Sequence, residues 1–342
     1  MRLDRRSFLT GTAAVLLAPR RGFAATVQDG AGRVVTLPGT VERVFPAGPP
    51  AAILLYTLAP DLLLGWPRAN RGPELEFLMP DVGRRPEVGR LTGRGNTANL
   101  EAVLLHKPDL ILDSGSVTET YVSLADRVQD QTGISYALLN GRFDHIPQSY
   151  RTLGRLVGRE RESEALAVYA EDTMKAVTGR TLKVPEAKRP LVYYARGPRG
   201  LETGLGGSIN VETIEFVGAR NVAGDQRGGL ANVSIEQVLV WDPEVIVTID
   251  QDFARDVRSD PRWASVAAVK AGRVHLSPKL PFGWVDFPPS VNRLIGLWWL
   301  GKILYPELFP EDLRDRTRDF HARFYHVTLS NKQIERVLAG RD

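Results

Sequence analysis

The stretch Asn99-Leu-Glu-Ala-Val-Leu-Leu-His-Lys-Pro-Asp-Leu-Ile-Leu112 returns as Ser234-Ile-Glu-Gln-Val-Leu-Val-Trp-Asp-Pro-Glu-Val-Ile-Val247, with a constant offset of 135 residues. Each copy begins with a residue that caps helix N-termini well and carries a glutamate in the first turn. A short apolar helix follows, and a proline then ends it. The last residues of each copy form the apolar run that is typical of a buried parallel strand. Two copies of one helix–proline–strand unit predict two α/β lobes of similar design.

Further strands and one long helix fit this plan. Strands are predicted at 41–45, 62–66, 110–112 and 135–139 in the first half, and at 191–194, 245–249 and 274–276 in the second. Between the halves, apolar residues recur at helical spacing over 160–182, and Pro185 ends the pattern. The predicted fold is therefore α/β, with two lobes of mostly parallel sheet at 26–158 and 185–342. One linking helix within 159–184 joins them.

The segment 289–337 is predicted to form several helices that complete the second lobe. Its apolar stretch, 294–305, contains Trp298 and Trp299. A bilayer-spanning helix needs about 20 apolar residues, so this stretch is predicted to be core.

Residues 1–25 are predicted to be a twin-arginine export signal. Arg5-Arg6-Ser7-Phe8-Leu9 matches the export motif, a short apolar run follows, and Ala24 lies in a small-residue context that suits signal peptidase. The alternative is a basic amphipathic N-terminus of a cytosolic protein. Export predicts a soluble periplasmic protein with no membrane insertion after cleavage.

The charge balance argues against nucleic-acid binding. The whole chain has 44 Lys and Arg against 40 Asp and Glu, a net charge of +4. Without the five arginines and one aspartate of residues 1–25, 39 of each sign remain. A phosphate-tracking surface needs a surplus of cations on the folded domain. The chain also has no cysteine, which excludes disulfides, thiolate metal sites and lipid attachment through cysteine.

The order of motifs resembles the periplasmic substrate-binding proteins of ABC importers for iron–siderophore complexes, haem or cobalamin. The resemblance covers roughly residues 27–310. It is carried by the repeats together with Asp29-Gly-Ala-Gly-Arg-Val-Val-Thr-Leu-Pro38, Val41-Glu-Arg-Val44, Val88-Gly-Arg90 and Gly272-Arg-Val-His275. It implies two α/β lobes bridged by one rigid helix, with a ligand in the cleft, a monomeric protein and no catalysis.

The resemblance also implies a role for the first-turn glutamates of the repeats. In this family one surface glutamate on each lobe docks onto arginines of the membrane permease, and the matching residues are Glu101 and Glu236. Exposed carboxylates on both lobes suit a two-fold partner. The simpler interpretation, that each glutamate only stabilises its helix dipole, holds in any case.

The ligand site is expected in loops that follow the strands, because ligands of α/β sheets bind at the carboxyl ends of strands. Arginine forks suit carboxylate, catecholate or oxyanion groups, and aromatic rings stack on organic ligands. The candidate ligand-binding residues are Pro49, Thr92, Arg94, Ser116, Arg196, Arg199, Arg227, Trp284 and Asp286. A surface salt bridge is the alternative for each arginine, and core packing is the alternative for Trp284.

The resulting hypothesis is a periplasmic carrier of a metal chelate, chiefly an iron(III)–siderophore, that delivers it to an ABC permease. No cofactor and no metal site of the protein's own is predicted, since the five histidines are scattered and cysteine is absent. Molybdate or tungstate, cobalamin and haem remain alternatives on the same fold. A periplasmic enzyme on a two-lobed scaffold is the alternative from another class.

Overall fold

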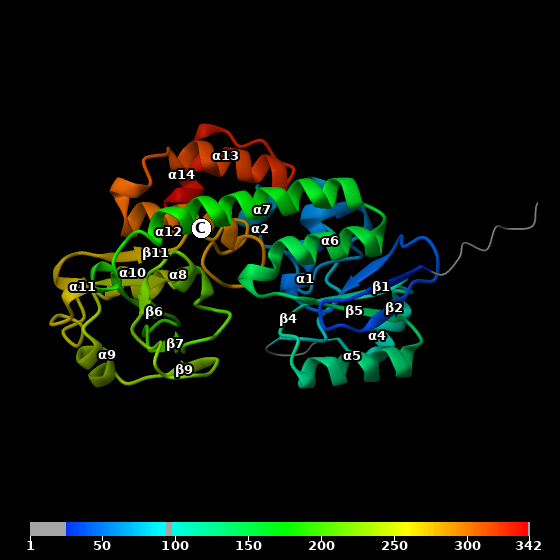
Figure 1. Cartoon of the computed structure of the whole chain (residues 1–342), viewed down its shortest axis with the longest axis horizontal. Coiled ribbons are helices and arrows are strands. Elements are labelled where there is room, and N and C mark those ends of the chain that lie inside the picture. Colours follow the sequence, from blue (N-terminus) through cyan, green and yellow to red (C-terminus); the bar gives the residue numbers. More distant parts are fainter. Residues whose placement is uncertain (1–24, 94–97, 341–342) are drawn as a thin grey trace, which may run out of the picture.

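The computed structural model describes residues 25–93 and 98–340, which form two α/β lobes joined by a long helix. In Figure 1 the first lobe lies at the right in blue and cyan, and the second lies at the left in green and yellow. The helix α7 (Glu160–Thr181) crosses above both. The predicted fold class and the linking helix are confirmed. The predicted export signal and Arg94 lie outside the described residues.

A short parallel sheet forms the core of the first lobe. Its strands are β3 (Val44–Pro46), β4 (Leu110–Gly115) and β5 (Ser135–Asn140), in the order β3-β4-β5. An antiparallel pair, β1 (Thr26–Gln28) and β2 (Val34–Thr36), packs beside it. The helices of this lobe are α1 (Pro49–Leu58), α2 (Gly72–Leu75), α3 (Pro80–Gly83), α4 (Leu100–Leu105), α5 (Glu119–Thr132) and α6 (Ile146–Val157), with 3-10 turns at Pro60–Leu62 and Phe143–His145.

One strand prediction in this lobe is wrong. Residues 62–66 form no strand: the 3-10 turn Pro60–Leu62 leads into an irregular segment that makes isolated bridges from Leu63 to Val44 and from Trp66 to Glu87. A short buried apolar run has no periodicity that separates a strand from an irregular core segment.

The second lobe has a four-stranded parallel sheet. It contains β6 (Leu191–Ala195), β8 (Arg220–Asn221), β10 (Val245–Thr248) and β11 (Val274–Leu276), in the order β11-β10-β6-β8. Strands β7 (Glu202–Gly204) and β9 (Leu230–Asn232) form a separate antiparallel pair. The helices are α8 (Glu212–Phe216), α9 (Ile235–Trp241), α10 (Gln251–Asp256) and α11 (Ala267–Lys270).

The two repeats fold alike. The Asn99 side chain accepts a hydrogen bond from the Ala102 amide at 2.8 Å, and Ser234 caps α9 through the Gln237 amide at 3.2 Å. Lys107 and Asp242, which correspond in the two copies, have φ angles of 45° and 38° just before the prolines. Both helices then lead into a buried strand, β4 or β10. The repeat therefore sets the same local geometry in both lobes.

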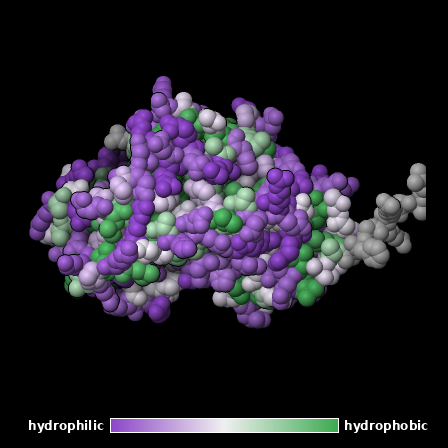
Figure 2. All heavy atoms as spheres, turned by 45° about the horizontal axis from the view of Figure 1, so that its top comes forward, coloured by the Kyte–Doolittle hydropathy of each residue, from purple (hydrophilic) through white to green (hydrophobic). Residues whose placement is uncertain are grey.

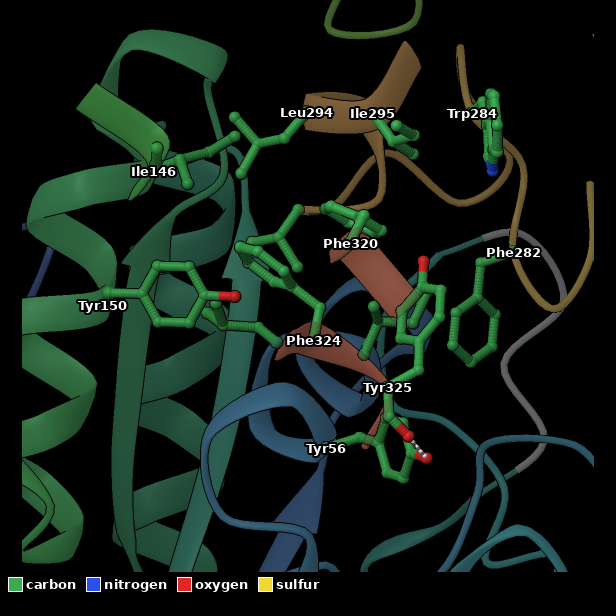
Figure 3. Packing of buried hydrophobic residues seen from close by; sticks show 14 of the residues in the cluster. Tyr56, Ile146, Tyr150, Phe282, Trp284, Leu294, Ile295, Phe320, Phe324 and Tyr325 are labelled. Atoms are coloured by element: carbon green, nitrogen blue, oxygen red, sulfur yellow. Dashed lines mark hydrogen bonds between the residues drawn. The ribbon is translucent and has the colours of Figure 1, made fainter. Parts of the chain in front are cut away.

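The C-terminal helices return to the first lobe. They are α12 (Arg293–Leu304), α13 (Leu313–Phe324) and α14 (Asn331–Leu338), and the predicted helical character of this segment is confirmed. The Tyr56 hydroxyl on α1 donates to the Tyr325 carbonyl at 2.7 Å, inside an aromatic cluster that Figure 3 shows. Arg336 on α14 pairs with Glu76 at 2.7 Å. One apolar core thus runs through both lobes.

The surface is largely polar where α7 and α13 lie. Figure 2 shows mostly hydrophilic residues on this face, with small apolar patches between them. Within residues 25–93 and 98–340, none of the helices combines the length and the apolar character that a bilayer crossing requires.

Helices α6 and α7 pack closely at Gly154. A methyl group there would lie 2.6 Å from the Ser163 Cβ and against its hydroxyl, whereas a methyl group at exposed Gly179 would meet nothing within 4 Å. We therefore expect Gly154→Ala to lower the free energy of unfolding by about 1–3 kcal/mol through overpacking. The matched variant Gly179→Ala should raise it by about 0.4–1 kcal/mol. Urea titration of both variants tests this, and a stabilising Gly154→Ala would contradict it.

Candidate functional site

A cavity of about 340 Å³ lies between the two lobes. The first lobe contributes the N-terminal turn of α1, the segment 66–74 and Arg90, and the second lobe contributes the segment 279–288. Most of the wall is proline, aliphatic or aromatic, with a few polar side chains among them. A mostly apolar cavity with a few placed polar groups is typical of a small-molecule site.

Cations surround the polar part of the cavity. Arg68, Arg71, Arg90 and Lys279 line it, and Glu74 is the one acidic residue of the described wall. Arg68 forms a two-pronged contact with Glu74, at 2.9 and 2.6 Å, and this contact raises the pKa of the Arg68 guanidinium. In the part of the chain that the structure describes, Arg71 forms no ion pair. The cavity is thus suited to an anionic ligand group, with Arg71 as its first contact.

Three aromatic rings form the apolar wall. The Trp66 indole donates to the Val82 carbonyl at 2.8 Å, and the Trp66 and Phe282 rings lie 5.9 Å apart. Phe287 is 65% exposed although it lines the cavity, and its backbone has a φ of 64°. A bulky residue seldom adopts a positive φ, and such strain is typical of ligand-contacting segments. Phe287 therefore offers an exposed aromatic face at the cavity.

A buried polar network holds the loop that carries Phe287. Asp286 is wholly buried, forms an ion pair with Arg196, and accepts hydrogen bonds from Tyr194 at 3.1 Å and Asn210 at 2.8 Å. Burial raises the pKa of the Tyr194 hydroxyl well above its usual value. The Arg196 guanidinium also lies 5.9 Å from the Phe287 ring. Arg196 and Asp286 thus fix the loop rather than line the cavity.

Of the predicted ligand-binding residues that the structure describes, only Pro49 lines the cavity. The Thr92 hydroxyl donates to Asp113 at 3.0 Å, beside Gly48 at the start of α1. The Ser116 hydroxyl lies 3.3 Å from that of Thr118. Arg199 and Arg227 are exposed away from the cavity wall. Trp284 is 0% exposed and packs in the core, although Phe282 and Phe287 of the same loop line the cavity.

The sequence interpretation missed the segment that supplies Arg68, Asn70, Arg71 and Glu74. The sequence does contain a pattern that could have identified this segment as a candidate site. Directly after a tryptophan, Pro67-Arg-Ala-Asn-Arg-Gly-Pro73 combines turn-forming residues with two arginines. Lys279 and Phe287 were also missed, although Phe287 directly follows Asp286, which was expected to bind ligand.

The glutamates of the two repeats lie on the surface, as expected. Glu101 and Glu236 are exposed, one on each lobe, and neither lines the cavity. The pKa of Glu236 is lowered, chiefly by a hydrogen bond from its own backbone amide and then by the Ser234 hydroxyl. Within the described residues, no group of three or more histidine, aspartate or glutamate side chains is arranged to hold a metal ion.

Comparisons with known proteins place this geometry in a family. The model of the periplasmic binding protein family matches residues 58–280. The molybdate-binding protein MolA of Haemophilus influenzae is 26% identical, covering 78% of this chain and 80% of that protein. An ABC transporter solute binding protein from Sulfurospirillum deleyianum superposes with a TM-score of 0.83 at 29% identity, covering 92% of this chain and 99% of that chain. The solved structure of MolA bound to molybdate superposes with a TM-score of 0.74 at 23% identity, covering 90% and 99%. Because the family match spans more than half of the sequence, the chain belongs to the periplasmic binding protein family of ABC importers.

Proposed function

We propose that this protein captures a compact anionic metal chelate, such as an iron(III)–siderophore, in the cavity between its lobes and delivers it to an ABC permease. The observation that carries this proposal is the composition of the cavity wall. It pairs an aromatic surface of Trp66, Phe282 and Phe287 with cations from both lobes.

An organic chelate uses both parts of this wall. Its ligand shell presents apolar or aromatic surface, which the rings can cover, and oxygen groups, which guanidinium forks can bind. A chelate also brings its own metal ligands. Bare-metal binding would need a protein ligand cluster that the described residues do not form.

The volume of the cavity counts against the largest of the alternative ligands, cobalamin. A cavity of about 340 Å³ holds a compact ligand. Cobalamin is much larger than such a ligand and would need the lobes to open beyond the arrangement in the structure, whereas haem and a ferric siderophore are similar in size and the volume does not separate them. Contacts of the C-terminal helices with the first lobe oppose such opening.

Molybdate or tungstate is the second candidate. Its support is the similarity to MolA and the ring of cations. Two features count against a bare oxyanion: most of the wall is apolar, and Pro49 and Pro50 remove two backbone N–H donors from the N-terminus of α1.

Binding without catalysis fits the wall better than enzymatic turnover. The one carboxylate of the described wall, Glu74, is held by Arg68 and by the Arg71 amide at 2.7 Å. A nucleophile–base pair does not line the described cavity. The proposal includes export through the twin-arginine signal in residues 1–25, a monomeric carrier in the periplasm, and permease docking through Glu101 and Glu236.

Tryptophan fluorescence of the exported protein tests the ligand. Trp66 lines the cavity and is expected to report occupancy. Titration against ferric siderophores, molybdate, tungstate, haem and cobalamin should give saturable quenching with a ferric siderophore, and Trp66→Phe should remove most of that signal. Quenching by molybdate alone would favour the second candidate. Silence across the panel together with turnover of a periplasmic substrate would overturn the proposal.

The cation Arg71 supplies a specific prediction. We expect Arg71→Gln to weaken binding of the anionic ligand by about 10- to 100-fold, because a hydrogen bond to a charged group contributes about 1.5–3 kcal/mol. Arg84→Gln, at an exposed arginine outside the cavity, is the matched control and should leave the affinity unchanged. Calorimetric titration of both variants measures the difference. Equal affinities for the two variants would remove Arg71 from the site.

A further inference from the structure

Phe287 differs from the other two aromatic side chains of the cavity wall. Its exposed fraction is 65%, whereas Trp66 and Phe282 are 2% and 6% exposed. The Trp66 ring lies 5.5 Å from that of Tyr56, and the Phe282 ring lies 5.5 Å from that of Tyr325. Within the described residues, no other aromatic ring packs on Phe287. Phe287 therefore offers the cavity a ring whose outer face is uncovered.

The loop that carries this ring is firmly held. Asn292 is wholly buried, and its side-chain amide donates to the Gly283 carbonyl and, at 3.1 Å, to the Pro288 carbonyl. These two bonds tie the ends of the loop together. A methyl group at Gly283 would lie 2.2 Å from the Asp286 carbonyl oxygen, so the loop also packs closely on itself. The exposure of Phe287 is thus a feature of a well-packed loop.

The backbone of Phe287 supports the same conclusion. A bulky residue seldom adopts a φ such as its 64°, and a strained conformation persists only where the surrounding structure fixes it. The preceding residue, Asp286, supplies that restraint through its ion pair with Arg196 and its hydrogen bonds from Tyr194 and Asn210. The buried network therefore determines where the exposed ring points.

Arg196 lies on the protein side of the Phe287 ring. Its guanidinium is 5.9 Å from the ring centre, and Arg196 is 7% exposed, so the exposed face of the ring points away from the cation. The face of an aromatic ring is electron-rich, and a cation over one face is attracted to it. The cation withdraws electron density from the ring, which reduces the repulsion that an electron-rich ring would meet on the other face. The exposed face is thus suited to an anionic aryl group.

We propose that Phe287 is a specificity-determining residue of the cavity, which stacks on an anionic aryl group of the chelate and thereby selects catecholate-type chelates over aliphatic chelates of the same charge. Asp286 and Arg196 act as its positioning residues. This inference rests on the proposed function. The cations of the wall attract any anion and do not distinguish the two kinds of chelate. Discrimination between them requires a contact that only one kind can make, and the uncovered ring is such a contact.

Two metal complexes of equal charge test this selection by calorimetric titration. The iron(III) complex of a tripodal tris-catecholamide and tris(oxalato)chromate(III) are both trianions, but only the first carries aryl groups. Phe287→Leu keeps an apolar side chain and removes the ring. It should weaken binding of the catecholamide complex by about 3- to 10-fold and change binding of the oxalate complex by less than about 2-fold. Leu182→Ala, at an exposed apolar residue outside the cavity, should bind both complexes as wild type does.

A second variant tests the positioning residues. Removal of Arg196 alone would leave the buried Asp286 carboxylate unpaired, so Arg196→Met is combined with Asp286→Asn. This double variant leaves Phe287 in place. It should lose the preference for the catecholamide complex by about the same 3- to 10-fold and retain its affinity for the oxalate complex. A merely structural role would weaken binding of both complexes alike, and that result would contradict the positioning role.

The outcomes separate ligand selection from the carrier function. Equal effects of Phe287→Leu on the two trianions, or no effect on either, would overturn the selection by Phe287. If wild type still bound a ferric siderophore of the fluorescence panel, the proposed carrier function would stand. Binding of an aliphatic ferric siderophore but not of the catecholamide complex would have the same meaning. Binding of neither trianion and of no compound of the panel would overturn both proposals.

Discussion

Replacing Glu212 by glutamine is expected to lower the free energy of unfolding by about 3–5 kcal/mol, because it leaves a buried guanidinium without its counter-charge. Arg293 is wholly buried and lies 3.1 Å from the Glu212 carboxylate. Burial lowers the pKa of Arg293, and the Glu212 charge opposes that effect. The side chain of Glu212 is itself only 7% exposed, so water does not screen the pair strongly.

The same carboxylate joins the two lobes. It accepts a hydrogen bond from the Phe143 amide at 2.9 Å and lies 2.7 Å from the Arg142 guanidinium, both in the first lobe. Arg293 in turn donates to the Gly141 carbonyl at 2.8 Å. Glutamine retains the size of the side chain but removes the charge that all three donors use. The loss should therefore exceed that of an ordinary surface substitution.

Urea unfolding of wild type and Glu212→Gln measures the effect. Glu164→Gln removes one carboxylate of the exposed pair with Arg151 and should leave the midpoint unchanged within error. Glu212→Met with Arg293→Met should recover part of the loss, since apolar residues of similar volume replace buried ion pairs well. A Glu212→Gln midpoint equal to that of Glu164→Gln would show that the buried cluster is not a stabilising feature.

The buried cluster of Glu212 and Arg293 could not be predicted from the sequence. The repeat revealed the lobes because caps, prolines and apolar runs act locally, and the strands β4, β5, β6, β10 and β11 follow those signals closely. The pairing of Glu212 with Arg293, or of Arg196 with Asp286, joins residues far apart in the chain. No local pattern identifies such partners, and Arg196 was consequently expected to bind ligand rather than to fix a loop.

The sequence also could not predict which side chains of an irregular loop face the cavity. The segment 281–289 contains Phe282, Trp284 and Phe287, and the sequence interpretation expected Phe282 and Trp284 to stack on an organic ligand. In the structure Trp284 is 0% exposed and Phe287 is 65% exposed. Which aromatic residue of an irregular segment faces outward depends on tertiary packing, since no helical or strand period relates the two. The cavity does lie between the two lobes, but most of the predicted ligand-binding residues that the structure describes are not in its wall.

Acid is expected to destabilise the protein through His321 between pH 6.5 and pH 4. The side chain is wholly buried on α13, its Nδ1 lies 2.9 Å from the Thr317 carbonyl, and the Tyr325 ring is 5.0 Å away. Burial lowers the pKa of His321 from 6.5 to about 4. In the unfolded chain the imidazole takes up a proton near pH 6.5, whereas the folded protein resists protonation until about pH 4. Stability is therefore highest above pH 6.5 and falls as the pH drops toward 4.

The expected loss of stability on acidification follows from the pKa values of His321 in the unfolded and the folded protein. Their difference corresponds to about 3 kcal/mol of unfolding free energy lost between about pH 7 and pH 4. His275 and His326 also have lowered pKa values because of burial, so they add to the acid sensitivity with the same sign. A comparison of pH dependences, rather than of stabilities at one pH, is needed to isolate His321.

The variant His321→Asn removes the titrating group and retains a donor close to the Thr317 carbonyl. Urea unfolding of both proteins at several pH values between about 7 and 4 should give a variant that is less stable at neutral pH but loses about 3 kcal/mol less on acidification. His145→Asn, at an exposed histidine, should follow the wild-type pH dependence. If wild type and His321→Asn lost stability in parallel, the acid sensitivity would belong to the other buried groups.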